Sequence, residues 1–231
     1  MNGQMKPERP ELRIIRESLE ALVAPSMVSS AIFEALEAIG GDLAQGGAAA
    51  SEFVQGPLRD ALARRMGADA HPVIDDVLAM IGAVTPSGPG AVRRGGDVTR
   101  EVFVDSRPVI VIVVSAGHAF ASKLQAALGA TRVIPIPAAS LERMDEQLRV
   151  AAPQMVLVDS ADFAPIEPER LALFLEKLPA TTVRAIWGAD LPYGGAVLRA
   201  MITRSIPATP LDRREGIDPV LDLIRSRQLV R

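Results

Sequence analysis

The 231-residue sequence contains no cysteine. This absence excludes disulfides, thiolate metal sites and a cysteine nucleophile, and it is typical of proteins from a reducing cytoplasm. The only two histidines, His71 and His118, lie in different halves of the chain, so we do not expect a histidine-based metal site. Aromatic residues make up only 3% of the sequence, with one Trp and one Tyr. Platforms for stacking nucleic-acid bases are therefore not expected.

Long apolar runs are also missing. The longest, at residues 108–114, has the length of a strand, whereas a bilayer-spanning helix needs roughly 18 residues or more. The charged residues among the first ten are not followed by the apolar stretch of a secretory signal. We therefore expect a soluble, cytoplasmic protein with no membrane partner.

The sequence has no concentration of basic charge. Residues 1–82 hold 7 Lys/Arg and 12 Asp/Glu, a balance of −5, and the remainder holds 18 Lys/Arg and 16 Asp/Glu, a balance of +2. Binding to a phosphate backbone depends on clustered Lys and Arg. We therefore do not expect nucleic acid as a partner, and we interpret the arginine pair at 213–214 as solvated surface.

The first part of the chain has the apolar spacing of amphipathic helices. Leu12, Ile15 and Leu19 recur at intervals of three and four residues, as one helix face requires. Similar patterns predict helices at 11–23, 26–39 and 51–66, and a fourth from residue 69 or 70. Gly56-Pro57 predicts a kink or a split in the third helix. We expect residues 1–84 to form an all-α helical bundle domain.

Residues 85–107 are expected to link two domains. Pro, Gly and Ser are so frequent between Thr85 and Gly96 that neither a helix nor a strand can be sustained. Such a composition is typical of a flexible connection.

From residue 108 to the end, strand and helix patterns alternate. Strands are predicted at 109–114, 132–136, 155–158, 183–187 and 205–208, and helices at 119–128, 141–151, 168–177, 195–203 and 217–227. Five such units predict an α/β domain at 108–231 with a doubly wound, parallel five-stranded sheet. Sites in sheets of this kind lie at the carboxyl ends of the strands.

Residues 108–228 resemble the receiver (CheY-like) domain of response regulators. Four runs carry the resemblance: Ile110–Val114 with the helix that follows and Gly129, the strand that ends on Asp159, Val183–Ala189 as the fourth strand, and Ala208-Thr209-Pro210 before the last helix. The resemblance implies that Asp159 corresponds to the phosphoacceptor of the family.

The other chemical positions of a receiver are not kept. The family holds Mg²⁺ with acidic residues after its first strand and adds a hydroxyl and a lysine after its fourth and fifth; here Ser115-Ala116, Gly188 and Thr209 fall at those positions. Phosphoryl transfer depends on neutralising charge, and Mg²⁺ prefers carboxylate oxygens. The resemblance therefore implies a degenerate pseudo-receiver, in which Asp159 is not phosphorylated by the usual Mg²⁺-dependent route. We expect neither Mg²⁺ nor any other cofactor.

Three other interpretations of these residues remain. Asp159 has the position of an ordinary turn or helix-capping residue. Asp162 and Asp190 lie near strand ends, although the family places no carboxylate there. Ser115 and His118 have the spacing of a nucleophile and a base, but no Gly-x-Ser-x-Gly elbow surrounds the serine.

These observations favour a non-catalytic signalling adaptor over an enzyme. Its partner is expected to be another protein or a second copy of the chain in a homodimer. Trp187 and Tyr193 are candidate interaction residues, since large aromatics anchor interfaces; the alternative for Trp187 is that it fills the core. A second hypothesis is a response or transcriptional regulator with an N-terminal effector domain and an atypical phosphoacceptor, Asp159.

Overall fold

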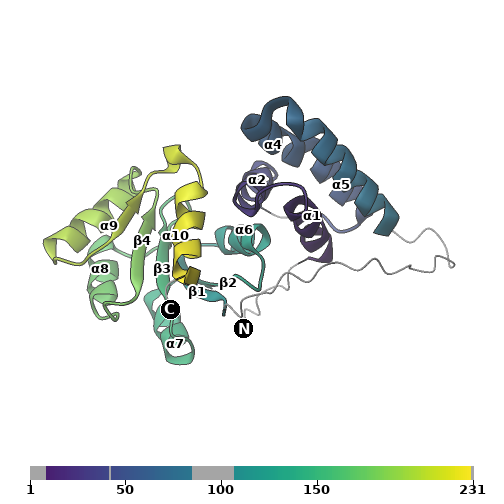
Figure 1. Ribbon diagram of the computed structural model, residues 1–231. Coiled ribbons are helices and arrows are strands. Elements are labelled where there is room, and N and C mark those ends of the chain that lie inside the picture. Colours follow the sequence, from purple (N-terminus) through teal and green to yellow (C-terminus); the bar gives the residue numbers. More distant parts are fainter. Residues whose placement is uncertain (1–8, 42, 85–106, 230–231) are drawn as a thin grey trace.

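The computed structural model describes residues 9–41, 43–84 and 107–229, which form two parts lying side by side (Figure 1). We call residues 10–84 the helical segment and residues 108–229 the α/β part. The predicted linker at 85–107 lies outside the described residues except for Arg107. Within the described part of the chain, no helix combines the length and the apolarity needed to cross a membrane.

The helical segment consists of amphipathic helices around a core of their own. Its elements are α1 (Pro10–Glu20), α2 (Pro25–Ala38), α3 (Gly47–Phe53), the π-helical turn η1 (Val54–Leu58), α4 (Arg59–Met66), the 3₁₀ turn η2 (Gly67–Asp69) and α5 (Ala70–Val84). The third predicted helix thus begins earlier than residue 51. It widens into a π turn around Pro57, because proline has no N–H for the α-helical hydrogen bond.

The α/β part is built on five parallel strands in the order β2-β1-β3-β4-β5. The strands are β1 (Val109–Val114), β2 (Val133–Ala138), β3 (Met155–Asp159), β4 (Val183–Trp187) and β5 (Thr209–Leu211). Alternate residues of β1 enter two different cores: Val111 and Val113 one, Ile112 and Val114 the other. Since both faces are covered, the strand is apolar throughout. The prediction of an α/β fold with a five-stranded parallel sheet is confirmed.

Helices cover the two faces unequally (Figure 1). The helices α6 (Ala119–Leu128) and α10 (Asp218–Leu229) lie on the face that the helical segment adjoins, whereas α7 (Leu141–Val150), α8 (Pro168–Glu176) and α9 (Pro192–Thr203) cover the opposite face. Helix α2 packs against α6 and also contacts α10. The Phe33 side chain of α2 enters the core between the sheet and α6.

The last strand lies later in the sequence than predicted. Residues 205–208 do not form it: Ser205 has a left-handed φ of 57°, and Ile206 donates its N–H to the Met201 carbonyl at 2.9 Å. These residues terminate α9, and β5 begins only at Thr209.

Candidate functional site

Asp159 ends β3 at the carboxyl edge of the sheet and is only 3% exposed. Its Oδ1 accepts hydrogen bonds from the backbone N–H groups of Ala161 at 3.0 Å and Asp162 at 3.5 Å. These bonds stabilise the turn that follows the strand, a common role for an aspartate at this position. Burial raises the pKa of the Asp159 carboxyl, while the two N–H groups and the positive charge of Arg213 oppose this shift.

The loop after β1 is held to the loop after β3 through Asp162. The carboxylate of Asp162 accepts the N–H of Gly117 at 3.0 Å, and its carbonyl accepts the N–H of Ala116 at 2.8 Å. Ser115 is buried, and its hydroxyl donates to the Gly117 carbonyl at 2.7 Å. The hydroxyl of Ser115 is thus directed to the backbone and not to His118, so the nucleophile–base interpretation receives no support.

The carboxylates near the strand ends are occupied by backbone contacts. Asp190 accepts the N–H of Arg213 at 3.2 Å and lies 3.8 Å from Nε of Arg214, while Asp159 and Asp162 bind the N–H groups given above. Among residues 9–41, 43–84 and 107–229, no group of three or more Asp, Glu or His side chains has the arrangement to hold a metal ion.

Gly188 directly follows β4 with a left-handed φ of 80°. A Cβ at this position would lie 3.0 Å from the Leu191 side chain and 3.3 Å from the side chains of both Ser160 and Arg213. Few residues other than glycine adopt this backbone conformation. A hydroxyl-bearing residue would therefore be both strained and crowded here.

The strand register places Thr209 away from the level of Asp159. Asp159 pairs with Trp187, which pairs with Leu211. Thr209 lies two residues earlier, at the beginning of β5. Because β5 begins only at Thr209, this residue does not stand level with Asp159. The buried Leu211 stands at that level instead. The correspondence of Thr209 to the receiver's lysine stays a prediction.

A cation at this edge of the sheet was not anticipated from the sequence. Arg213 follows β5 by two residues, and its guanidinium lies 6.0 Å from the centre of the Trp187 ring. Its Nη2 is 3.2 Å from Oε1 of Glu37 in α2. Its side chain is 35% exposed, and that of Arg214 is 83% exposed. The arginine pair therefore lies at the surface, and Arg213 has in addition an ion pair that the sequence did not predict. Arg213 lies beside the site because β5 begins as late as Thr209, and the sequence pattern did not show this late start.

The two aromatic candidates have different environments. Trp187 is 4% exposed and packs against Phe120, with ring centroids 6.3 Å apart. Its ring therefore fills the core and is not available as a surface anchor. Tyr193 stacks on Phe163 at 4.5 Å and donates its hydroxyl to the Ile166 carbonyl at 2.8 Å. Burial raises the pKa of Tyr193 to about 12. The exposed ring of this stack is that of Phe163, which is 50% exposed.

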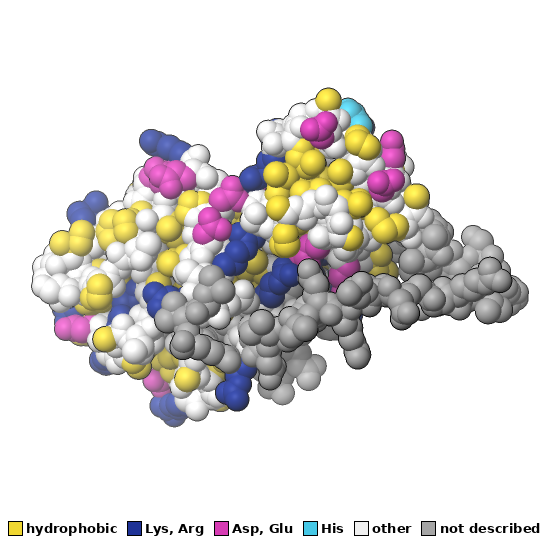
Figure 2. All heavy atoms as spheres, in the orientation of Figure 1, with side chains coloured by type: hydrophobic (Ala, Val, Ile, Leu, Met, Phe, Trp, Pro, Cys, Tyr) yellow, Lys and Arg dark blue, Asp and Glu magenta, His cyan; other side chains and the backbone are white. Residues whose placement is uncertain are grey.

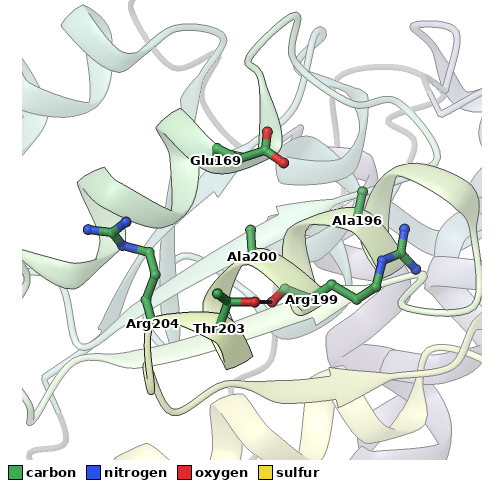
Figure 3. A pocket seen from close by; sticks show the side chains of 6 residues that line it. All are labelled: Glu169, Ala196, Arg199, Ala200, Thr203 and Arg204. Carbon is green, nitrogen blue, oxygen red and sulfur yellow. Dashed lines mark hydrogen bonds between the residues drawn. The ribbon is translucent and has the colours of Figure 1, made fainter.

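A groove of about 300 Å³ lies between α8 and α9 (Figure 3). Ala196 and Ala200 line it from α9, and Glu169 approaches from α8. Arg199 and Arg204 also line it, but Arg204 is paired with Glu176 at 2.6 Å. Charged side chains of both signs therefore surround the groove, so the lining does not favour either an anionic or a cationic ligand.

The fold defines a class, an α/β protein with a doubly wound parallel sheet and a polar site at the carboxyl edge. No protein-family model, curated protein or solved structure matches the chain. A function for this site must therefore be argued from its own geometry.

Proposed function

We propose that this chain is a non-catalytic signalling adaptor in which residues 108–228 act as a pseudo-receiver and residues 1–84 as a helical domain. The observation that carries the proposal is the composition of the strand ends. Asp159 stands in register with Trp187 and Leu211, two buried apolar side chains. Neither β4 nor β5 therefore supplies a hydroxyl or a lysine at this level to balance the charge of a phosphoryl group, which is what phosphoryl transfer requires.

The hydrogen bonds of the strand-end loops support the same proposal. The Asp159 carboxylate stabilises its own turn, and Asp162 joins two loops. Both carboxylates therefore have a structural role at this edge of the sheet, and this role needs no phosphoryl chemistry. Binding to another protein, or to a second copy of the chain, is then the means by which the adaptor acts.

Phosphorylation of the full chain tests the proposal directly. The chain is incubated with acetyl phosphate and Mg²⁺ and its intact mass is measured, with the Asp159→Asn variant as control. We expect neither protein to gain a phosphoryl adduct. A stable adduct on the wild-type chain that is missing from Asp159→Asn would refute a non-phosphorylated adaptor.

One observation favours the alternative of a regulator with an atypical phosphoacceptor. Arg213 brings a positive charge whose effect reaches Asp159, and a guanidinium is suited to binding phosphoryl oxygens. If this alternative holds, an adduct forms on the wild-type chain and is lost or strongly slowed in Arg213→Met. The same mass measurement therefore separates the two functions.

A further inference from the structure

The contact between the helical segment and the α/β part combines ion pairs with apolar packing: Phe33 enters the core of the α/β part, and Ala126 of α6 joins the core of the helical segment. Figure 2 shows Lys, Arg, Asp and Glu side chains gathered where the two parts meet. Glu20 pairs with Arg132 at 2.6 Å, and Asp218 pairs with Arg65 at 2.9 Å and accepts a hydrogen bond from Ser30. Polar contacts of this kind are typical of interfaces that open and close.

Phe33 is the apolar anchor of this contact. It is 1% exposed, meets Phe120 edge-to-face with centroids 5.5 Å apart, and carries the Lys123 ammonium 4.9 Å from its ring centre. Phe120 in turn packs against Trp187, the residue paired with Asp159. The anchor of α2 is thus two ring contacts away from the candidate site.

Glu37 is the charged link between the two parts. Its Oε1 lies 3.2 Å from Nη2 of Arg213 and 3.7 Å from Nζ of Lys123. Arg213 also lies beside the end of the strand that carries Asp159. Its Cδ and the Cβ of Ser160 are each 3.3 Å from the position that a Cβ on Gly188 would occupy, and its guanidinium lies 6.0 Å from the ring centre of Trp187, the register partner of Asp159. From there its positive charge opposes the rise in the pKa of Asp159 that burial causes. One guanidinium therefore pairs with a carboxylate of the helical segment and lies near the carboxyl at the strand end.

We propose that the helical segment is a built-in cover on the α6–α10 face, and that Arg213, which pairs with Glu37 and lies beside the strand end of Asp159, makes its docking respond to the charge at the strand ends. When Asp159 carries less negative charge, the ion pair between Arg213 and Glu37 becomes stronger and docking is favoured. When Asp159 carries more negative charge, it attracts Arg213 away from Glu37 and docking is weakened. By linkage, docking and the charge state of Asp159 affect one another by the same factor. The inference goes beyond the proposed function: it needs a change of charge at Asp159 and does not need phosphorylation of that residue.

Because the chain has no cysteine, docking can be measured with two introduced spin labels. Glu52→Cys in the helical segment and Lys177→Cys in the α/β part are both at exposed positions. Pulsed electron–electron distance measurements on the full chain then give the ratio of docked to undocked molecules. Phe33→Ala brings this ratio into the measurable range, and Phe33→Leu replaces it if circular dichroism shows that the alanine variant does not fold.

In this background we expect Glu37→Gln to lower the docked-to-undocked ratio about twofold to fivefold, the effect measured for partly exposed ion pairs. Asp159→Asn should raise the ratio by a factor in the same range, and this rise should vanish when Arg213→Met is also present. Glu176→Gln removes a comparable pair with Arg204 within the α/β part and should change nothing. The proposal is overturned if Asp159→Asn leaves the ratio unchanged, or raises it equally without Arg213. These distances report docking whatever the phosphorylation test shows, so each proposal can fail without the other.

Discussion

At the scale of single residues, Tyr193 offers the clearest test because it is the only tyrosine in the chain. Burial raises its pKa from 10.0 to about 12. We expect the ultraviolet absorbance of the phenolate to stay low at pH 11 in the folded protein, and to rise near pH 10 in the urea-unfolded chain. The contribution of this group to stability is then full below pH 10 and is lost as the pH rises towards 12.

A rapid pH jump keeps the protein folded while the absorbance is read, and Tyr193→Phe gives the baseline. A phenolate signal at pH 11 that appears within the mixing time would contradict the buried hydroxyl. The Tyr193→Phe variant should also lose the hydrogen bond to the Ile166 carbonyl, at a cost of about 1 kcal/mol.

The buried carboxyl of Asp159 should make the free energy of unfolding of the protein depend on pH. Burial raises its pKa above 3.8 in the folded state, so its favourable contribution is complete at low pH and is lost as the pH rises through the folded pKa. Asp159→Asn removes this titration and keeps an oxygen acceptor for the turn. The free energy of unfolding of Asp159→Asn minus that of the wild type should therefore increase from pH 3 to pH 7.

Urea unfolding at several pH values measures this difference, and the contributions of all other carboxylates cancel in it. Asp222→Asn, an exposed pair partner of Arg225, serves as the matched control and should show no such increase. A difference for Asp159→Asn that falls with pH would show that the N–H groups and Arg213 outweigh burial.

At the scale of elements, two adjacent glycines in α9 give opposite predictions. A Cβ on Gly194 would lie 2.2 Å from the Gly188 carbonyl oxygen and 2.5 Å from the Ser160 hydroxyl, whereas a Cβ on Gly195 meets nothing closer than 3.4 Å. Gly194→Ala should therefore cost about 1–3 kcal/mol through overpacking. Gly195→Ala should be neutral or stabilise by up to about 1 kcal/mol, the helix preference of alanine.

Urea unfolding followed by the fluorescence of Trp187 compares the two variants. Because the substitution and the helix are the same, only the contacts of the new methyl group differ. Equal free energies of unfolding would contradict the close approach of α9 to the loop after β4.

The elements also show what the sequence could predict. The uniform apolar character of β1 and the alternation of strands and helices identified the parallel sheet, because these patterns follow directly from burial on both faces. The error lay at β5, only three residues long, whose place depends on the turn at Ser205. Because the strand begins later than predicted, Thr209 lies two residues before the level of Asp159, and Arg213 lies beside the site. The ion pair of Arg213 with Glu37, 176 residues away, leaves no local signal in the sequence.

At the scale of the whole molecule, Phe33 should hold the two parts together. It is buried in the core of the α/β part although it belongs to α2. Phe33→Ala should lower the free energy of unfolding by about 3–5 kcal/mol and uncouple the parts. Circular dichroism, which follows all helices, and Trp187 fluorescence, which follows the α/β part, should then report different urea midpoints, whereas the two midpoints coincide in the wild type.

Phe53→Ala is the control that distinguishes an effect of lost docking from an effect of lost core volume. Phe53 is 2% exposed and lies in the core of the helical segment, so its removal leaves the surroundings of Trp187 unchanged. We expect the native emission of Trp187 to remain as in the wild type in Phe53→Ala and to shift in Phe33→Ala, because only Phe33 contacts Phe120 and, through it, the Trp187 ring. If both variants shift the emission alike, Phe33 is not a specific anchor, and docking depends on the other contacts between the two parts.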